Sequence, residues 1–469
     1  MPSRILLISA NRCTTPDAVF PLGLAHLNAA LRQAGHSILW FDGLAGTARL
    51  EETLENYRPD FIGVSLRNVD DVLIRRRETF FDDAVTLGER IRRQTHSPLI
   101  VGGSGFSIFP RRLLELTGAD FGVCGEGEDG FVSLLAALER GGDVRGIPGL
   151  VFRENGKVVV NPRSPSPFAG ETEEEDRPAA VTAPYLQANG TLNLQTQRGC
   201  GFRCCYCTYP LIEGKRHRRR PPETVAAELE QLQRLGARHV FVVDSIFNST
   251  PHHVTEVCEA ILRRQVKLPW SCFLRPQGLT PGLMNLMARA GLTHIEFGSD
   301  SFCDEILQAY EKDFTFDDIL YSSELARREK IEACHFLICG GPGETEGTLE
   351  QSWHNSRRLN GTVIMAVVGM RIYPGTHLFE RAVAEGQTER DADLLQPTYY
   401  LAPGLNEAAV FAQLEEFARQ SPNWIVGDAS PEYYNLVGRL RQRGVVGPLW
   451  SYFAMLQQIK PQTVVRPQS

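Results

Sequence analysis

The stretch that decides the fold of this chain is Arg198-Gly199-Cys200-Gly201-Phe202-Arg203-Cys204-Cys205-Tyr206-Cys207. Three of its cysteines follow a C-x3-C-x2-C spacing, which can bring three thiolates onto one iron–sulfur cube and leave the fourth iron open to bind another molecule. The predicted ligands of a [4Fe–4S] cluster are therefore Cys200, Cys204 and Cys207. The fourth thiol of the group, Cys205, is interpreted as a bystander.

Two other kinds of metal site match this stretch less well. A structural zinc site normally takes four ligands from two separated pairs, but no second pair follows Cys207. A ferredoxin-type cluster needs a fourth cysteine at a defined distance, usually followed by proline, and the sequence has none there. A different metal site and purely structural thiols remain as the alternatives.

The cysteine stretch directly follows the first strand of a repeating β–α pattern. Apolar runs typical of strands occupy residues 192–196, 239–244, 271–274, 294–298, 336–339 and 364–371, separated by helical patterns such as 222–235 and 317–328. Six such units predict a partial (β/α)6 barrel over residues 191–385. Because ligands bind at the C-terminal ends of barrel strands, the cysteines are expected at the functional end.

A separate alternation of apolar runs and helical patterns precedes it, from residue 4 to about 140. Its candidate strands are residues 5–9, 37–41, 61–66, 98–102 and 121–124. This pattern predicts an α/β domain, a doubly wound (Rossmann-like) parallel sheet over residues 1–145. Such sheets bind ligands beyond their C-terminal strand ends, where the sequence places loops at residues 66–70, 102–106 and 125–128. Glycine-rich loops of this kind can cradle a large cofactor or a phosphate; tight turns in an interaction domain are the alternative.

The remaining segments connect or follow these two units. The pattern of residues 147–161 predicts a hairpin around Asn155-Gly156. Proline and acidic residues in 162–190 indicate a linker. Hairpin and linker together, residues 146–190, are expected to separate the two domains. Residues 386–469 read as a small, mostly helical C-terminal region.

Composition favours an intracellular cofactor protein. The chain has 469 residues, a net charge of −7 and 11 cysteines, four of them within eight residues. That distribution does not suggest a disulfide framework and indicates a metal site in a reducing cytoplasm. No signal peptide and no apolar stretch long enough to span a bilayer is recognisable. The acidic balance argues against a general nucleic-acid binder.

The cysteine spacing, with an aromatic residue before its last cysteine, resembles the radical S-adenosylmethionine (radical SAM) superfamily. The resemblance covers roughly residues 190–385 and implies that the open iron chelates S-adenosylmethionine, which is cleaved to a 5′-deoxyadenosyl radical. It places Tyr206 against the adenine, and Asp300 and Ser301 at the ribose. The segment Gly340-Gly341-Pro342-Gly343-Glu344-Thr345 resembles the fifth-strand signature, with Gly340 and Gly341 approaching the ligand closely. Tyr373-Pro374-Gly375-Thr376 resembles the sixth-strand segment.

The N-terminal pattern resembles the cobalamin-binding (B12-binding) domain that precedes the barrel in one class of these enzymes. Pro21-Leu22-Gly23-Leu24 and the two glycine-rich loops carry this resemblance. The Asp-x-His-x-x-Gly motif, which supplies a histidine to cobalt in many cobalamin proteins, is missing. Arg67 and Asn68 are instead expected near the lower face of the corrinoid. The other expected cobalamin contacts are Gly102, Gly103, Ser104, Gly105, Gly125 and Glu126.

Together the two resemblances imply a radical SAM methyltransferase that acts on an unactivated carbon of a small molecule, natural product or lipid intermediate. One S-adenosylmethionine would methylate cob(I)alamin, and a second would generate the radical that abstracts a substrate hydrogen. An external electron donor, such as flavodoxin or ferredoxin, would be the partner. Cyclisation, ring contraction or rearrangement without methyl transfer is one alternative, and a non-catalytic redox or corrinoid sensor is another. The basic run from Lys215 to Arg220 is interpreted as a solvated or domain-bridging strip rather than a nucleic-acid site.

Overall fold

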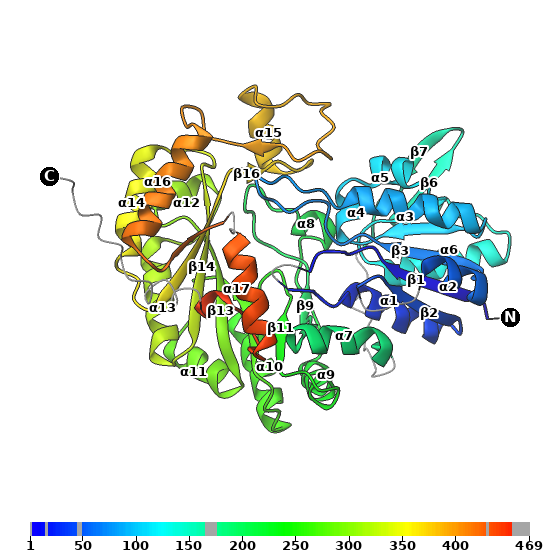
Figure 1. Ribbon diagram of the computed structural model, residues 1–469, viewed down its shortest axis with the longest axis horizontal. Helices are drawn as coiled ribbons and strands as arrows, with labels where there is room; N and C mark the ends of the chain where they lie inside the picture. Colours follow the sequence, from blue (N-terminus) through cyan, green and yellow to red (C-terminus); the bar gives the residue numbers. More distant parts are fainter. Residues whose placement is uncertain (1, 15–16, 45–48, 165–175, 428–430, 453–469) are drawn as a thin grey trace.

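A computed structural model describes residues 2–14, 17–44, 49–164, 176–427 and 431–452. It consists of two α/β units that lie side by side, with the N-terminal unit on the right of Figure 1 and the second on the left. Within the described residues, no helix is both long and apolar enough to cross a membrane.

The N-terminal unit is built on a seven-stranded sheet in the order β2-β1-β3-β4-β5-β6-β7. The first five strands are parallel, as the sequence predicts, and a hairpin adds two antiparallel strands at the edge. Asn155 and Gly156 close the hairpin with positive φ angles of 51° and 76°, as a tight turn of this kind requires. The strands are β1 (Arg4–Ser9), β2 (Ser37–Asp42), β3 (Phe61–Ser65), β4 (Leu99–Gly102), β5 (Phe121–Val123), β6 (Leu150–Glu154) and β7 (Lys157–Val160).

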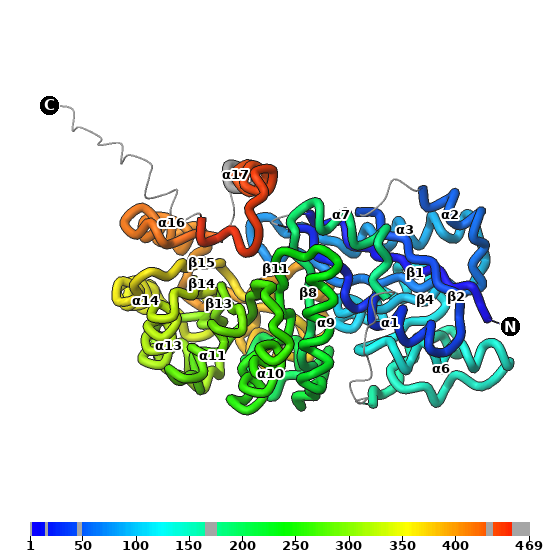
Figure 2. Tube along the Cα trace, turned by 90° about the horizontal axis from the view of Figure 1, so that it is seen from below, coloured from blue at the N-terminus to red at the C-terminus, as the bar shows by residue number. Residues whose placement is uncertain are grey.

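Helices cover both faces of this sheet, as Figure 2 shows for α1 and α6 on one face and α2 and α3 on the other. Side chains of β1 alternate between the faces: Ile5 and Leu7 pack with α1 and α6, and Leu6 and Ile8 pack with the opposite helices. The helices are α1 (Leu22–Gln33), α2 (Leu50–Tyr57), α3 (Phe81–Gln94), α4 (Ser104–Ile108), α5 (Pro110–Thr117) and α6 (Gly127–Glu139).

The second unit is a curved parallel sheet in the order β18-β15-β14-β13-β12-β11-β8. Its first six strands in the chain are those that the sequence predicts: β8 (Thr191–Leu194), β11 (His239–Val242), β12 (Trp270–Leu274), β13 (Leu292–Asp300), β14 (Glu332–Cys339) and β15 (Thr362–Val368). Between them lie α9 (Pro222–Arg234), α10 (Pro251–Arg263), α11 (Pro281–Arg289), α12 (Asp304–Ala309), α13 (Phe316–Arg328) and α14 (Glu346–Ser356). The predicted partial barrel is therefore confirmed.

Two segments differ from the expectation. A short strand, β18 (Trp424–Val426), extends the barrel sheet from within the C-terminal region; three residues without alternation leave no periodic signal. Helix α7 (Ala179–Asn189) occupies part of the expected linker, because Val181 and Tyr185 bury against Phe20 and the first unit. The acidic run 171–175 lies outside the described residues.

Apart from β18 and a two-residue strand at 399–400, the regular elements of the described C-terminal region are helices, as expected: α16 (Glu407–Gln420) and α17 (Pro431–Gln442). Helix α15 (His377–Ala384) lies before this region, at the end of the predicted barrel segment. The remaining short elements are α8 (Tyr209–Ile212) and the two-residue pairs β9 (Gln197–Arg198) with β10 (Arg218–Arg219), and β16 (Met370–Arg371) with β17 (Tyr399–Tyr400).

Candidate functional site

The cysteine stretch forms the loop between β9 and α8, at the C-terminal end of the first barrel strand. Its backbone is held from both sides: the Cys200 N–H donates to Gly214 O at 3.0 Å, and the Cys207 N–H donates to Cys204 O at 3.1 Å. The pKa of the Cys207 thiol is raised to about 12, mainly because the thiol is buried. Repulsion between the charged forms of Cys207 and Cys204 raises it further. Binding iron as thiolates would therefore release protons from these side chains.

The three predicted ligands lie near one another in this loop. Cys200, Cys204 and Cys207 influence one another's charge. Within the described residues, no group of three metal-ligating side chains is arranged as a site for a single ion. The three cysteines are the residues that would hold the cluster.

Cys205 lies apart from this group. It is buried in an apolar cluster with Met370 and Leu378, and its backbone pairs with Tyr310 O and Leu378 N, at 3.1 and 2.8 Å. A side chain packed in this way is a small core residue, which supports its interpretation as a bystander.

Tyr206 and Asp300 lie together, although 94 residues separate them. The Tyr206 hydroxyl donates to Asp300 Oδ2 at 2.5 Å. Asp300 ends β13 with a positive φ of 63°, which aims its carboxylate toward the cysteine loop. The residue that sequence reasoning missed is Lys312, whose ammonium forms a buried ion pair with Asp300 and lies 3.5 Å from the Tyr206 hydroxyl. It sits in the loop between α12 and α13, where no sequence pattern marks it.

The other residues expected around S-adenosylmethionine are engaged within the barrel. The Ser301 hydroxyl lies 3.3 Å from Ser352 Oγ on α14. The Gly341 N–H donates to the Tyr310 hydroxyl at 3.0 Å, and the Gly340 N–H donates to Glu344 at 3.0 Å. A Cβ added at Gly341 would come within 2.4 Å of the Tyr310 hydroxyl, so this glycine is already required by the packing of the chain itself.

Two buried polar residues that follow β11 form hydrogen bonds with backbone groups. Asp244 accepts from the Thr196 N–H at 2.6 Å and the Gln197 N–H at 3.2 Å, directly before the cysteine loop. Burial raises the pKa of Asp244 to about 7. Asn248 exchanges hydrogen bonds of 2.9 Å with the backbone of Arg275.

In the N-terminal unit, the loops after β3 and β4 meet because glycines let their backbones approach. Gly103 has a φ of 101°, and a Cβ there would lie 2.5 Å from Leu66 O. The Gly105 N–H donates to the same carbonyl at 3.0 Å, and Ser104 Oγ donates to Arg67 O at 2.7 Å. The predicted corrinoid residues of these two loops are thus neighbours.

Arg67 lies near α8, the helix that follows the cysteine loop. Arg67 and Asn68 keep exposed surface, and desolvation by the surrounding protein lowers the pKa of the Arg67 guanidinium. Tyr209, two residues after the last cysteine, also keeps exposed surface, 39% of its total. Desolvation by the surrounding protein raises the pKa of its hydroxyl, and the charge of nearby Arg67 acts to lower that pKa. Helix α4 contacts α8 at the same place.

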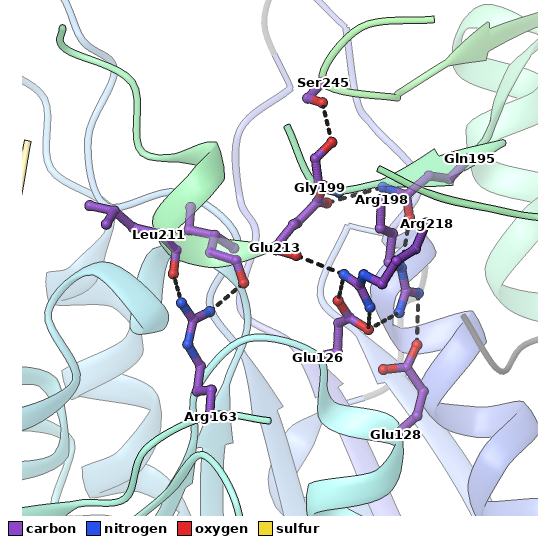
Figure 3. A network of polar contacts seen from close by, with 11 residues as sticks. Glu126, Glu128, Arg163, Gln195, Arg198, Gly199, Leu211, Glu213, Arg218 and Ser245 are labelled. Carbon is purple, nitrogen blue, oxygen red and sulfur yellow. Dashed lines mark hydrogen bonds and ion pairs between the residues drawn. The ribbon is translucent and has the colours of Figure 1, made fainter. Parts of the chain in front are cut away.

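The loop after β5 holds the cysteine loop through ion pairs, drawn in Figure 3. Glu126 accepts from Arg218 at 2.7 Å and lies 3.2 Å from Arg198, while Glu128 accepts from Arg198 at 2.7 Å. The Gly125 N–H donates to Ser107 Oγ at 2.8 Å. Glu126 was expected from sequence at the corrinoid; its observed partners are two arginines that flank the cysteines.

Comparisons with known proteins agree with both units. The family description "Radical SAM superfamily" matches residues 194–353, and "B12 binding domain" matches residues 9–135. An uncharacterized methyltransferase of Pyrococcus horikoshii is 27% identical, over 78% of each chain. The tryptophan 2-C-methyltransferase of Streptomyces laurentii is also 27% identical, over 79% of this chain and 73% of its own length.

A solved structure has the same fold over nearly the whole chain. It is the radical S-adenosylmethionine methyltransferase TsrM from Kitasatospora setae, with cobalamin and a [4Fe–4S] cluster bound. The TM-score is 0.87, with 24% identity and 98% of both chains covered.

Proposed function

Because the chain belongs to the radical SAM superfamily and carries a B12-binding domain, we propose that it is a cobalamin-dependent methyltransferase acting on an unactivated carbon of a small molecule. The observation that carries this proposal is the contact of α4 with α8. It brings the glycine-rich loop expected to hold cobalamin directly beside the loop of the three cysteines.

Each cofactor has candidate ligands on its own side of this contact. Cys200, Cys204 and Cys207 would hold the [4Fe–4S] cluster. Tyr206 would meet the adenine of S-adenosylmethionine and Asp300 its ribose. When bound, the cluster would supply the electron for reductive cleavage, and the cobalamin would carry the methyl group. The chain's contribution is to hold the two groups at the junction between its units, where α4 contacts α8.

Arg67 and Asn68 are the side chains that we propose near the lower face of the corrinoid, in place of a histidine. They project from the loop that Gly103 and Gly105 approach, and they keep exposed surface there. Without a nitrogen ligand from the protein, the cobalt of a bound cobalamin would be easier to reduce, which would favour methyl transfer. The electron for reduction would come from an external carrier such as flavodoxin or ferredoxin, in the reducing cytoplasm.

The test is product analysis with labelled S-adenosylmethionine. The full chain, loaded without oxygen with iron, sulfide and hydroxocobalamin, would be incubated with a reductant, deuteromethyl S-adenosylmethionine and a pool of candidate substrates. We expect a product that carries the labelled methyl group, with S-adenosylhomocysteine and 5′-deoxyadenosine formed alongside it. Cys205→Ala is the matched control for Cys204→Ala, which should form none of these. 5′-Deoxyadenosine without labelled product or S-adenosylhomocysteine would contradict methyl transfer.

A further inference from the structure

The basic run from Lys215 to Arg220 divides into two sets of side chains. Arg218 and Arg220 turn inward and pair with Glu126 and Glu228, each at distances of 2.6 to 2.7 Å. Lys215, Arg216 and Arg219 are exposed. For Arg218 and Arg219 the division follows from β10, which pairs antiparallel with β9 and so directs these two successive residues to opposite sides. Of the inward pair, Arg218 joins the two units through Glu126, whereas Arg220 pairs within the second unit, with Glu228 on α9. The outward set has a different use.

The outward set lies on the backbone that covers the cysteine loop. The Cys200 N–H donates to Gly214 O at 3.0 Å, and the Gly201 N–H donates to His217 Nε2 at 3.3 Å. A Cβ added at Gly199 would lie 2.1 Å from Arg216 O, so the segment leaves no room between itself and the loop. Exposed charges on this segment are thus separated from the cluster site by little more than one layer of backbone.

The charge of this surface differs from that of the chain as a whole. The chain has a net charge of −7, whereas Lys215, Arg216 and Arg219, together with exposed Arg203 in the cysteine loop, are all cations. Among the residues that the structure describes, none of these four forms an ion pair. A local positive field of this kind attracts an acidic protein and accelerates its encounter.

We propose that Arg203, Lys215, Arg216 and Arg219 form the docking surface for a small acidic electron-carrier protein. This inference rests on the proposed function, because the cluster must gain an electron that the chain does not supply. The carrier loses one electron and the cluster gains it, passing from its 2+ to its 1+ state. No bond is made or broken, and the carrier leaves oxidised by one electron.

The experiment measures reduction of the cluster alone, by stopped-flow absorbance, in the full chain without cobalamin or substrate. The variant is Lys215→Glu/Arg216→Glu/Arg219→Glu; Arg203 stays unchanged because it lies between two cluster ligands. The matched control is Lys267→Glu/Arg289→Glu/Lys330→Glu. These are three exposed cations that precede β12, β13 and β14, at the opposite end of the barrel. Reductants are fully reduced flavodoxin and, separately, dithionite.

We expect the variant to lose about tenfold or more in its second-order rate with flavodoxin, within the range that electrostatic steering provides. Its rate should also become nearly independent of salt, since salt screens the exposed charges that the wild type uses. Iron content and the dithionite rate should match the wild type, and the control variant should behave as wild type throughout.

An unchanged flavodoxin rate with an unchanged salt dependence would overturn the proposal. So would tight binding of an oligonucleotide by the wild type that is lost in the variant while the flavodoxin rate stays the same, because the surface would then serve nucleic acid. A chain that accepts electrons at this surface yet transfers no methyl group would refute the proposed function and leave the docking surface standing.

Discussion

At the scale of single residues, Lys312 places a positive charge beside the cluster site. It pairs with Asp300 in a buried ion pair and lies 3.4 Å from Gly298 O and 3.5 Å from the Tyr206 hydroxyl. It is also within hydrogen-bonding reach of Cys204. Hydrogen bonds to ligand sulfurs and nearby charge both set the reduction potential of an iron–sulfur cluster. Lys312 is therefore expected to influence the reduction potential of the cluster.

Replacing Lys312 tests this role. Lys312→Met should shift the midpoint potential of the cluster to a lower value, because the reduced cluster carries one more negative charge and loses a stabilising cation. Lys312→Arg, which keeps the charge, should restore most of the potential. The measurement is a redox titration followed by electron paramagnetic resonance, with Lys330→Met at the far end of the barrel as control. A potential that is equal in all four proteins would rule out the role.

The cysteines make the second prediction at this scale. Alanine at Cys200, Cys204 or Cys207 should abolish the cluster, because the motif supplies only three ligands and each substitution removes one of them. Cys205→Ala should retain it, since Cys205 packs with Met370 and Leu378. Iron and sulfide analysis after anaerobic reconstitution measures both. Loss of iron in Cys205→Ala, with retention in Cys204→Ala, would overturn the assignment.

The third prediction at this scale concerns Glu296 and the pH dependence of stability. Burial raises its pKa to about 7, and Trp450 Nε1 donates to it at 3.1 Å. Below pH of about 4.5 the carboxyl is protonated in both the folded and the unfolded chain. As the pH rises toward 7 only the unfolded chain releases the proton, so Glu296 costs an increasing share of stability, about 3 kcal/mol when complete.

Glu296→Gln should therefore gain in unfolding temperature relative to the wild type as the pH is raised from 5 to 8. The amide can still accept from Trp450, so the comparison isolates the charge. Thermal unfolding across this pH range provides the measurement. Parallel curves for the two proteins would show that Glu296 ionises as easily in the folded chain as in the unfolded one.

At the scale of secondary-structure elements, the turn between β5 and α6 acts as a clamp on the cysteine loop. Glu126 contacts Arg198, two residues before the first cysteine, and Arg218 on the covering strand. Figure 3 shows these side chains gathered between the two units, with Arg163 holding the carbonyls of α8 from a second direction. The clamp links the position of the N-terminal sheet to that of the cluster site.

Glu126→Gln should weaken this clamp. The amide cannot pair with two guanidinium groups that are themselves largely buried, and a lost charge-assisted hydrogen bond costs about 2 to 3 kcal/mol. Calorimetry should show a clear fall in unfolding temperature. Glu223→Gln, which removes an exposed partner of Arg263, is the matched control and should change little. Equal effects of the two substitutions would mean that the clamp contributes no more than a surface ion pair.

At the scale of the whole molecule, the two units share one interior. The loop after β3 reaches across to the barrel, where Asp70 accepts from Arg371 at 2.8 Å with both side chains buried. Ile74 of the same loop packs with Leu337 and Val368 of the barrel. Because Arg67 lies only three residues before Asp70, the barrel itself determines where the proposed lower-face residues stand.

This arrangement predicts a cobalamin without a histidine ligand. The full chain reconstituted with hydroxocobalamin and desalted should retain the corrinoid. After reduction to Co(II), its resonance spectrum should lack splitting by a protein imidazole nitrogen, because the loop at this position offers Arg67 and Asn68. Arg67→His is the informative variant, since a histidine there should introduce that splitting. Splitting already in the wild type, or no retained corrinoid, would contradict the prediction.

The sequence alone was enough to predict the two-unit architecture, all six barrel strands and the five parallel strands of the first sheet. These features depend on local signals: apolar periodicity identifies strands and helices, and the C-x3-C-x2-C spacing lies within one loop. The same local signals missed α7, which lies in the expected linker, and they left β18 unrecognised because three residues carry no periodicity.

Only the tertiary structure decided which distant residues meet. Glu126 with Arg198 and Arg218, and Asp70 with Arg371, are pairs that no spacing along the chain predicts, because each depends on how the two packed units orient their loops. Lys312 meets Asp300 within the barrel, where the loop between α12 and α13 returns to the end of β13. The division of the basic run into inward and outward side chains has the same origin. Whether an arginine bridges domains or faces solvent depends on the pairing of β10 with β9, and that pairing exists only in the folded chain.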